Sequence, residues 1–205
     1  MPPHGVAAGV PTERLALPGG RDVRASLDTN GQADAVLVAC PPHPQHGGTR
    51  HDGRLTAVSD ALPPRTDCLR FDYGPWDEGR GERTDAESAV EWAAERYDRV
   101  GLFGYSFGGG IALRVASEAD VVAVAALSPM AQLEDGTDVA AAVGRIGVPL
   151  WIGYGTRDDT VDAERVAAAA RDHGATVETF AADHFFVGQE SQVGERVAAF
   201  VENTL

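Results

Sequence analysis

The segment Gly104-Tyr105-Ser106-Phe107-Gly108-Gly109-Gly110 is the most informative part of this sequence. It follows an apolar run, 99–103, that is typical of a buried strand, and it precedes a helix-like run, 111–118. A strand that ends in a tight Gly-x-Ser-x-Gly turn and continues into a helix is the setting of a nucleophile elbow, in which the serine hydroxyl stands above the sheet. Glycines suit such a turn because a Cβ there would collide with neighbouring backbone. The segment therefore predicts Ser106 as a catalytic nucleophile.

The same pattern is compatible with a glycine-rich turn that only allows close packing. Glycine accounts for 24 of the 205 residues. With ordinary residue usage, a Gly-x-Ser-x-Gly pattern arises by chance in roughly one such chain in ten. The rest of the sequence has to decide between the two interpretations.

Length and composition indicate one globular domain. A chain of 205 residues that is 43% hydrophobic can bury a full core. We expect a loose tail over residues 1–12, rich in Pro, Gly and Ala, and a single domain over 13–205. No apolar run approaches the ~20 residues of a membrane span, and the N-terminus lacks the apolar region of a signal peptide. These features predict a cytoplasmic protein with no membrane partner.

The charge balance is strongly acidic. The formal net charge is −14, and every basic residue is arginine. Because phosphate contacts need a basic surface, we expect no nucleic-acid partner. One interpretation is an acidic, halophilic surface adapted to a salt-rich cytosol, where screening removes self-repulsion. The other is codon usage in a GC-rich genome, which explains arginine in place of lysine but not the acidic excess, so we favour the first.

Cys40 and Cys68 are the only cysteines, and both lie in apolar, strand-like runs. Two buried thiols are therefore expected, rather than a disulfide or a metal site.

Strand and helix patterns alternate along the chain after an N-terminal hairpin. The predicted strands are 14–17, 23–27, 33–39, 67–71, 99–103, 121–127, 149–154 and 176–180. The predicted helices are 55–62, 84–97, 108–117, 138–145, 162–173 and 192–202. Thr84 and Glu87 form a capping-box pattern at the start of the second helix. The series predicts an α/β fold with a mostly parallel sheet and helices on both faces, and it places Ser106 at the carboxyl end of a strand, where ligands bind in such sheets.

A serine hydroxyl becomes an effective nucleophile when a base takes its proton, and the usual base is a histidine oriented by a carboxylate. Asp158 follows a predicted strand and is the candidate acid, with Asp159 as the alternative. Asp158, Asp159 or Asp162 could instead cap the next helix. His184 follows the last strand and is the candidate base. The only other histidine beyond Ser106 is His173, which stands at a helix end and offsets the helix dipole there.

Two backbone N–H groups are needed to hold the oxyanion of such a reaction. Phe107, the residue after the nucleophile, supplies one of them. The other is expected from the loop 40–48. Because Pro44 has no N–H, Gln45 is the predicted donor and His46 the alternative.

Seven side chains near these loops are predicted to line the rim of the site. They are His43, His46, Tyr73, Trp76, Tyr105, Met130 and Phe185. Ordinary core packing is the alternative for each aromatic or apolar member. His43 and His46 could instead hold a metal ion, but no carboxylate or further histidine stands near them in sequence, so we expect neither a metal nor an organic cofactor. The segment 128–148 contains a single short helix pattern, which predicts no lid and an open site for small acyl substrates.

Together these motifs resemble those of compact serine hydrolases of the α/β-hydrolase superfamily that are related to dienelactone hydrolase. The resembling segments are His43-Pro44-Gln45-His46-Gly47-Gly48, Arg70-Phe71-Asp72, Gly104 to Gly109 and Asp183-His184-Phe185-Phe186. The resemblance covers about residues 30–205 and implies an α/β-hydrolase fold. It also implies hydrolysis of a small ester or thioester through an acyl-enzyme on Ser106, with Asp158 and His184 completing the triad. The elbow has serine where dienelactone hydrolases proper have cysteine, and the turn 73–79 differs from that of the subgroup, so their exact activity is not carried over.

Other functions stay open beside this one. Acyl transfer and peptide hydrolysis would use the same three residues. A binding module that keeps the fold without catalysis is a further alternative, although such relatives usually lose a member of the triad. We expect a small acyl substrate and a monomer or homodimer.

Overall fold

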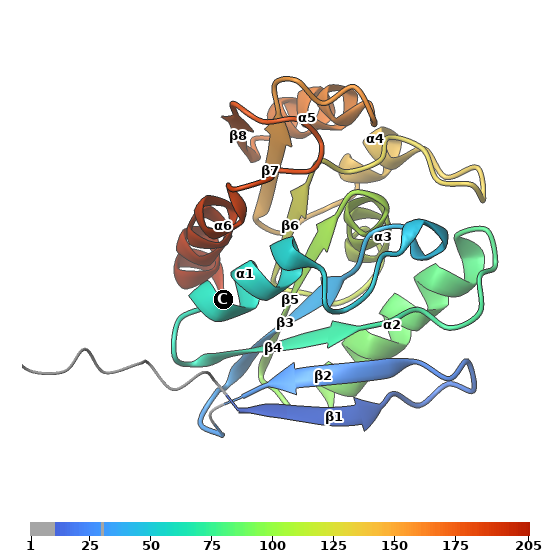
Figure 1. Ribbon diagram of the computed structural model, residues 1–205, viewed down its shortest axis with the longest axis vertical. Helices are drawn as coiled ribbons and strands as arrows, with labels where there is room; N and C mark the ends of the chain where they lie inside the picture. Colours follow the sequence, from blue (N-terminus) through green and yellow to red (C-terminus); the bar gives the residue numbers. More distant parts are fainter. Residues whose placement is uncertain (1–10, 30) are drawn as a thin grey trace, which may run out of the picture.

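A central eight-stranded sheet forms the core of the computed structural model, which describes residues 11–29 and 31–205 (Figure 1). The strands are β1 (Thr12–Ala16), β2 (Arg24–Asp28), β3 (Ala35–Cys40), β4 (Thr66–Phe71), β5 (Arg99–Tyr105), β6 (Ala123–Leu127), β7 (Leu150–Gly155) and β8 (Thr176–Phe180). Their order in the sheet is β1-β2-β4-β3-β5-β6-β7-β8. The hairpin β1–β2 and the pair β2–β4 are antiparallel, and all other pairs are parallel. The predicted hairpin and mostly parallel sheet are confirmed.

Helices cover both faces of this sheet, as predicted. They are α1 (Gly53–Ala61), α2 (Arg80–Ala94), α3 (Phe107–Ala116), α4 (Val139–Val143), α5 (Ala163–Asp172) and α6 (Glu190–Thr204), with a short 3-10 helix η1 (Pro44–His46). Helices α1 and α6 pack together on one face, and α2 to α5 pack on the other (Figure 1). Strand β3 shows why both faces need cover: Val36 and Val38 enter one core while Leu37 enters the other, because side chains alternate along a strand.

Helix α2 begins at Arg80 rather than at the predicted Thr84. Thr84 lies inside the helix, and its hydroxyl donates to the carbonyl of Arg80. The true start is capped by Glu82, whose fully buried carboxylate accepts hydrogen bonds from the amides of Asp77 and Gly79. The capping-box prediction was wrong because these two amides belong to the preceding loop, and the sequence alone does not show where that loop turns back on the helix.

The expected tail over residues 1–12 lies almost entirely outside the described residues. Thr12 already belongs to β1 and pairs with Asp28 of β2. Between β6 and β7 the described chain holds only the short helix α4, so no lid domain is inserted there. None of the helices in the described ranges combines the length and apolar character that a membrane crossing requires.

Cys40 and Cys68 are buried and free, as predicted. Burial raises the pKa of both thiols, that of Cys68 to about 12. Both are therefore protonated at neutral pH, and neither is a nucleophile.

Candidate active site

Ser106 occupies a sharp turn between β5 and α3. Its φ is 58° and its ψ is −118°, a conformation that costs a residue with a Cβ about 1–3 kcal/mol. Hydrogen bonds anchor the turn. The amide of Ser106 donates to the carbonyl of Leu127 at 2.9 Å, and its carbonyl accepts from the amides of Gly110 and Met130 at 3.1 Å. The end of β6 and the first turn of α3 therefore hold the serine in its strained backbone conformation.

Two glycines of the motif permit this turn by letting backbone segments meet. A Cβ on Gly104 would overlap the carbonyl oxygen of Gly108, and a Cβ on Gly108 would overlap the carbonyl oxygens of Cys40 and Pro41. Backbone atoms cannot move aside as a flexible side chain can. Helix α3 therefore reaches β5 and the loop after β3 only because both positions are glycine. The sequence pattern predicted glycine at this turn for the same reason, namely that a Cβ would collide with neighbouring backbone.

Ser106, His184 and Asp158 form a continuous hydrogen-bonded chain. The Oγ of Ser106 lies 3.0 Å from Nε2 of His184, and Nδ1 of His184 lies 2.8 Å from Oδ2 of Asp158. The three residues follow the carboxyl ends of β5, β8 and β7. The parallel sheet brings these ends to one edge, although His184 is 78 positions from Ser106 in sequence. The side chains of His184 and Asp158 are only 6% and 2% exposed, so little water competes for these bonds.

The carboxylate of Asp158 stays ionised in this setting. Burial acts to raise its pKa, but hydrogen bonds from His184 and from the amide of Thr160 outweigh that effect, so its pKa lies below the usual value. Its Oδ1 accepts from the amides of Thr160 and Val161. Ser128 also lowers the pKa of Asp158. Its buried hydroxyl has no hydrogen-bond partner within the described chain, so it acts on the carboxylate as a nearby dipole.

Asp159, the alternative acid, is exposed. No hydrogen bond joins it to His184 in the described part of the chain. The geometry therefore favours Asp158 over Asp159 as the partner of His184. His173, the other histidine beyond Ser106, ends helix α5 as its C-cap residue, as expected.

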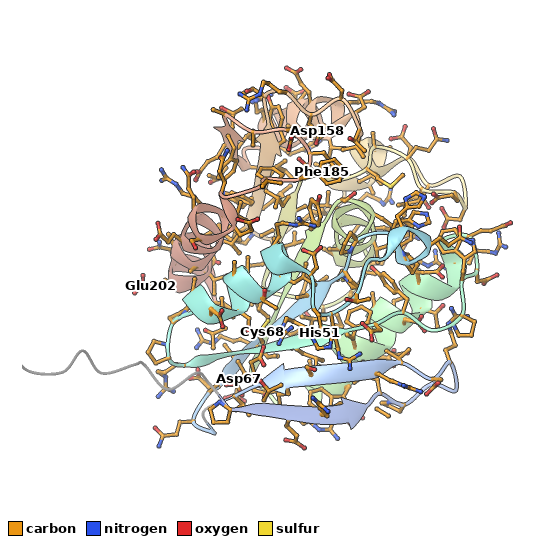
Figure 2. The ribbon with its side chains drawn as sticks, in the orientation of Figure 1. His51, Asp67, Cys68, Asp158, Phe185 and Glu202 are labelled. Atoms are coloured by element: carbon orange, nitrogen blue, oxygen red, sulfur yellow. The ribbon has the colours of Figure 1, made fainter. Side chains whose placement is uncertain are left out.

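Tyr105 and Arg54 hold the loop that carries His184. The hydroxyl of Tyr105 donates to the carbonyl of His184 at 2.9 Å. The guanidinium of Arg54 lies 4.4 Å above the centre of the Tyr105 ring and donates to the carbonyl of Phe185 at 3.1 Å. Asp52 pairs with the same guanidinium at 2.5 Å. Figure 2 shows Phe185 and Asp158 at the same end of the molecule. Neither Arg54 nor Asp52 belongs to a recognisable sequence motif, so residue patterns alone could not select them.

A pocket of about 570 Å³ opens over Ser106 and His184. Five of the seven predicted rim residues line it: His43, His46, Tyr105, Met130 and Phe185. It is also lined by residues that the sequence did not single out, namely Asp52, Arg54, Glu134, Thr160 and Val161. Tyr73 and Trp76 were predicted for the rim but lie behind it. The hydroxyl of Tyr73 donates to the carbonyl of Pro41 at 3.2 Å, and the ring of Trp76 packs 4.6 Å from that of His43.

The loop after β3 does not present Gln45 as expected. The amide of Gln45 donates to Nδ1 of His43 at 3.3 Å, and the amide of His46 donates to the carbonyl of His43 at 3.0 Å. Both predicted donors are therefore occupied within the loop itself, a short-range pattern that the sequence did not reveal. The amides of Phe107 and His43 make no hydrogen bond to the described residues, and the two rings lie 4.9 Å apart. His43 thus replaces Gln45 as the candidate second donor.

The Arg70-Phe71-Asp72 segment of β4 fixes the far end of the same loop. The guanidinium of Arg70 donates to the carbonyl of Arg50 at 2.5 Å, and the carboxylate of Asp72 accepts from the amide of Arg50 at 2.7 Å. This segment therefore supports the site without lining it.

The chain is similar to a known protein family and to several solved structures. A model of the dienelactone hydrolase family matches residues 76–203, whereas no curated protein matches. An α/β serine hydrolase homologue from Coxiella burnetii is 26% identical, with 91% of this chain and 96% of that chain covered and a TM-score of 0.79.

Two further structures share the fold at lower identity. A serine hydrolase without a lid from Xanthomonas campestris is 21% identical, covers 94% of each chain and has a TM-score of 0.78. An esterase from Pyrococcus furiosus is 17% identical, with 95% of this chain and 92% of that chain covered and a TM-score of 0.80. Because the family match spans more than half of the sequence, the chain belongs to the dienelactone hydrolase family and is an enzyme with the α/β-hydrolase fold.

Proposed function

We propose that this enzyme is a serine esterase that cleaves small carboxylic esters or thioesters through an acyl-enzyme on Ser106. The observation that carries the proposal is the chain Asp158–His184–Ser106, with its two contacts at 2.8 Å and 3.0 Å beneath an open pocket. These distances lie within the reach that a general base needs to take a proton from its nucleophile.

The catalytic cycle follows from the protonation state of His184. Its Nδ1–H donates to ionised Asp158, which leaves Nε2 free to take the hydroxyl proton as Oγ of Ser106 attacks the substrate carbonyl carbon. The C–O or C–S bond to the leaving group then breaks, and the imidazolium returns the proton to the departing alcohol or thiol. Water attacks the acyl-enzyme with His184 again as base, which releases the acid and restores Ser106.

The amides of Phe107 and His43 are the proposed donors to the oxyanion. Phe107 is the first residue of α3, so its N–H has no partner within the helix. The loop after β3 passes directly over the elbow, since the carbonyls of Cys40 and Pro41 occupy the space beside Gly108. That close approach supports a position for the His43 amide beside that of Phe107. Two such donors stabilise the tetrahedral intermediate, and loss of one typically costs about 100- to 1,000-fold in kcat.

The pocket supports a small or medium-sized acyl substrate. Its apolar wall includes Met130, Val161 and Phe185, and no lid covers it within the described chain. Sites of this kind bind apolar groups without strict selection by length. The relative from Pyrococcus furiosus is itself described as an esterase.

A fluorophosphonate probe tests the proposal directly. Wild type and the control Ser191→Ala, a change at an exposed serine of α6, should be labelled, and Ser106→Ala should not. Hydrolysis of p-nitrophenyl acetate and of an acetyl thioester should follow the same pattern. A folded wild-type protein that is not labelled, or equal labelling of Ser106→Ala, would exclude Ser106 as the nucleophile.

A further inference from the structure

A second histidine–carboxylate pair lies in the pocket, and the catalytic cycle above does not use it. Nε2 of His43 lies 3.2 Å from Oε1 of Glu134. His43 belongs to the loop between β3 and α1, and Glu134 belongs to the loop between β6 and α4, 91 positions further along the chain. The side chain of His43 is 11% exposed and that of Glu134 is 37% exposed. The pair thus joins two separate loops across one end of the pocket.

Other contacts confine the ring of His43. The ring of His46 stacks on it at 4.5 Å, and the rings of Trp76 and Phe107 lie 4.6 Å and 4.9 Å away. Its Nδ1 accepts the amide hydrogen of Gln45 at 3.3 Å. Both ring nitrogens of His43 are therefore engaged, one with each of two loops.

These two hydrogen bonds require a single tautomer. Nδ1 can accept from the Gln45 amide only when it carries no proton, so the ring proton resides on Nε2, where Glu134 accepts it. Among the described residues, Glu134 is the only hydrogen-bond partner of Nε2, so its removal would leave no acceptor there to hold the proton. A proton on Nδ1 would end the hydrogen bond from Gln45, and that bond caps η1.

We propose that Glu134 is a positioning residue for the oxyanion hole. By fixing the tautomer and orientation of His43, it holds η1 in place and thereby the direction of the His43 amide. Glu134 does not touch the reacting atoms and acts only through His43. The catalytic part of this inference rests on the proposed function, whereas the effect on the loop is a property of the resting protein.

The expected effect is intermediate in size. Removal of one hydrogen bond that only orients a donor should lower kcat about 3- to 10-fold, well below the ~100-fold loss on removing a donor. KM should change less than about twofold, because the contact stabilises the transition state and not the bound substrate. Glu134→Gln keeps an Oε1 acceptor on a side chain of the same length, so it should retain kcat within about twofold of wild type.

Steady-state hydrolysis of p-nitrophenyl acetate by Glu134→Ala and Glu134→Gln tests the catalytic part. The matched control is Glu202→Ala, which removes the same charge from the exposed end of α6, far from Phe185 (Figure 2). We expect Glu134→Ala to lose kcat and the other two variants to keep it. Unchanged kcat in Glu134→Ala would overturn the proposal, because Glu134 would then have no role in catalysis. An equal loss of kcat in Glu134→Gln or Glu202→Ala would also overturn it, because the loss would then reflect only the removed charge.

Hydrogen–deuterium exchange tests the loop itself and does not depend on turnover. The amides of Gln45, His46, Gly47 and Gly48 are all hydrogen-bonded within the loop. Their exchange should accelerate about 3- to 10-fold in Glu134→Ala and stay unchanged in Glu134→Gln. Equal exchange in all variants would overturn the inference whatever the kinetics. A wild type that hydrolyses no ester would refute the proposed esterase while this measurement still decides the role of Glu134.

Discussion

At Ser106 the chain accepts local backbone strain in order to present a hydroxyl. Its positive φ is held by neighbours on β6 and α3, so the strain persists only because the surrounding fold imposes it. The strand, the Gly-x-Ser-x-Gly segment and the following helix run indicated a sharp turn at this position, and the structure has that turn between β5 and α3. The sequence could not indicate which amide of the facing loop is the candidate donor to the oxyanion. The Gln45 amide is occupied by a hydrogen bond to Nδ1 of His43, and that bond depends on side-chain rotamers.

Comparison of Ser106→Gly with Ser106→Ala isolates this strain, because both changes remove the hydroxyl. Glycine tolerates the conformation and alanine does not, so Ser106→Gly should be more stable to urea by about 1 kcal/mol. The opposite order is expected at an exposed helix position: Ala168→Gly in α5 should lose about 1 kcal/mol. A Ser106→Gly protein that is less stable than Ser106→Ala would show that the elbow is unstrained.

Asp158 and Asp159 can be told apart by paired substitutions. Asp158→Asn removes the acceptor that selects the His184 tautomer, so kcat should fall about 10,000-fold. Asp159→Asn alters an exposed side chain and should leave kcat within about twofold. The measurement is steady-state ester hydrolysis by both variants, with circular dichroism to check folding. Similar losses in the two variants would contradict the assignment.

At the scale of elements, the strands were the most predictable part. Strand β8 matches its predicted range, and the other predicted strands differ from the observed ones only at their ends, because apolar runs between turn residues mark buried strands clearly. Helix α2 was less predictable. Its start depends on Glu82 reaching back to loop amides, which is a tertiary contact. Arg54 and Glu134 escaped notice for the same reason, since each acquires its place in the pocket from packing between distant segments.

The packing of α3 against β3 and β5 should be very sensitive to Gly108. In Gly108→Ala the new methyl group would overlap the carbonyls of Cys40 and Pro41, and we expect a loss of about 3 kcal/mol or more in the free energy of unfolding. Gly147→Ala is the control, because a Cβ there meets no atom within 4 Å. Urea denaturation measures both. Equal stability of the two variants would contradict the close approach of α3.

Asp28 connects β2 to its neighbours through a buried carboxylate. It accepts hydrogen bonds from Arg70 of β4, from Ser59 of α1 and from Thr12 of β1. Burial acts to raise its pKa, but these partners outweigh burial and the pKa is lowered. A carboxyl group with a lowered folded-state pKa stabilises the protein above its unfolded-state pKa, and that contribution is lost as the pH falls through the folded value.

Asp28→Asn should therefore lower the free energy of unfolding at pH 7 by about 3 kcal/mol. It should also flatten the decline of stability between about pH 5 and pH 3. Urea unfolding at pH 7, 5, 4 and 3 measures both effects. Asp172→Asn, at the exposed end of α5, should change stability by less than about 0.5 kcal/mol. A variant that keeps the pH dependence of wild type would show that Asp28 is not its source.

On the scale of the whole molecule, the sequence predicted the fold class but not the order of the strands. The alternation of patterns requires a layered sheet, yet the position of β4 between β2 and β3 follows from how the crossover helices pack. The pocket is a second example, because its lining comes mainly from the loops that follow β3, β5, β6, β7 and β8, and the sheet brings the carboxyl ends of these strands to one edge. Residue patterns therefore predicted which three side chains meet at Ser106 better than they predicted the pocket surface around them.

The net charge of −14 should make stability dependent on salt. Repulsion among carboxylates is screened as ionic strength rises, so we propose that the protein is adapted to a salt-rich cytosol. Its melting temperature should rise between low salt and ~2 M KCl, and the Debye length falls below ~3 Å over that range. Thermal melts followed by circular dichroism provide the test. A flat or falling melting temperature would favour codon usage as the origin of the acidity.

The contact between Trp76 and His43 has a practical consequence. Trp76 lies beside the loop that faces Ser106, whereas Trp92 of α2 stacks with Arg96, just beyond the end of that helix, and Trp151 is buried near Phe180. Indole emission responds to the orientation and charge of an adjacent imidazole. The acyl-enzyme proposed above on Ser106 should therefore change the ultraviolet fluorescence of this protein, which would allow rapid-mixing experiments on natural, uncoloured substrates without an attached dye.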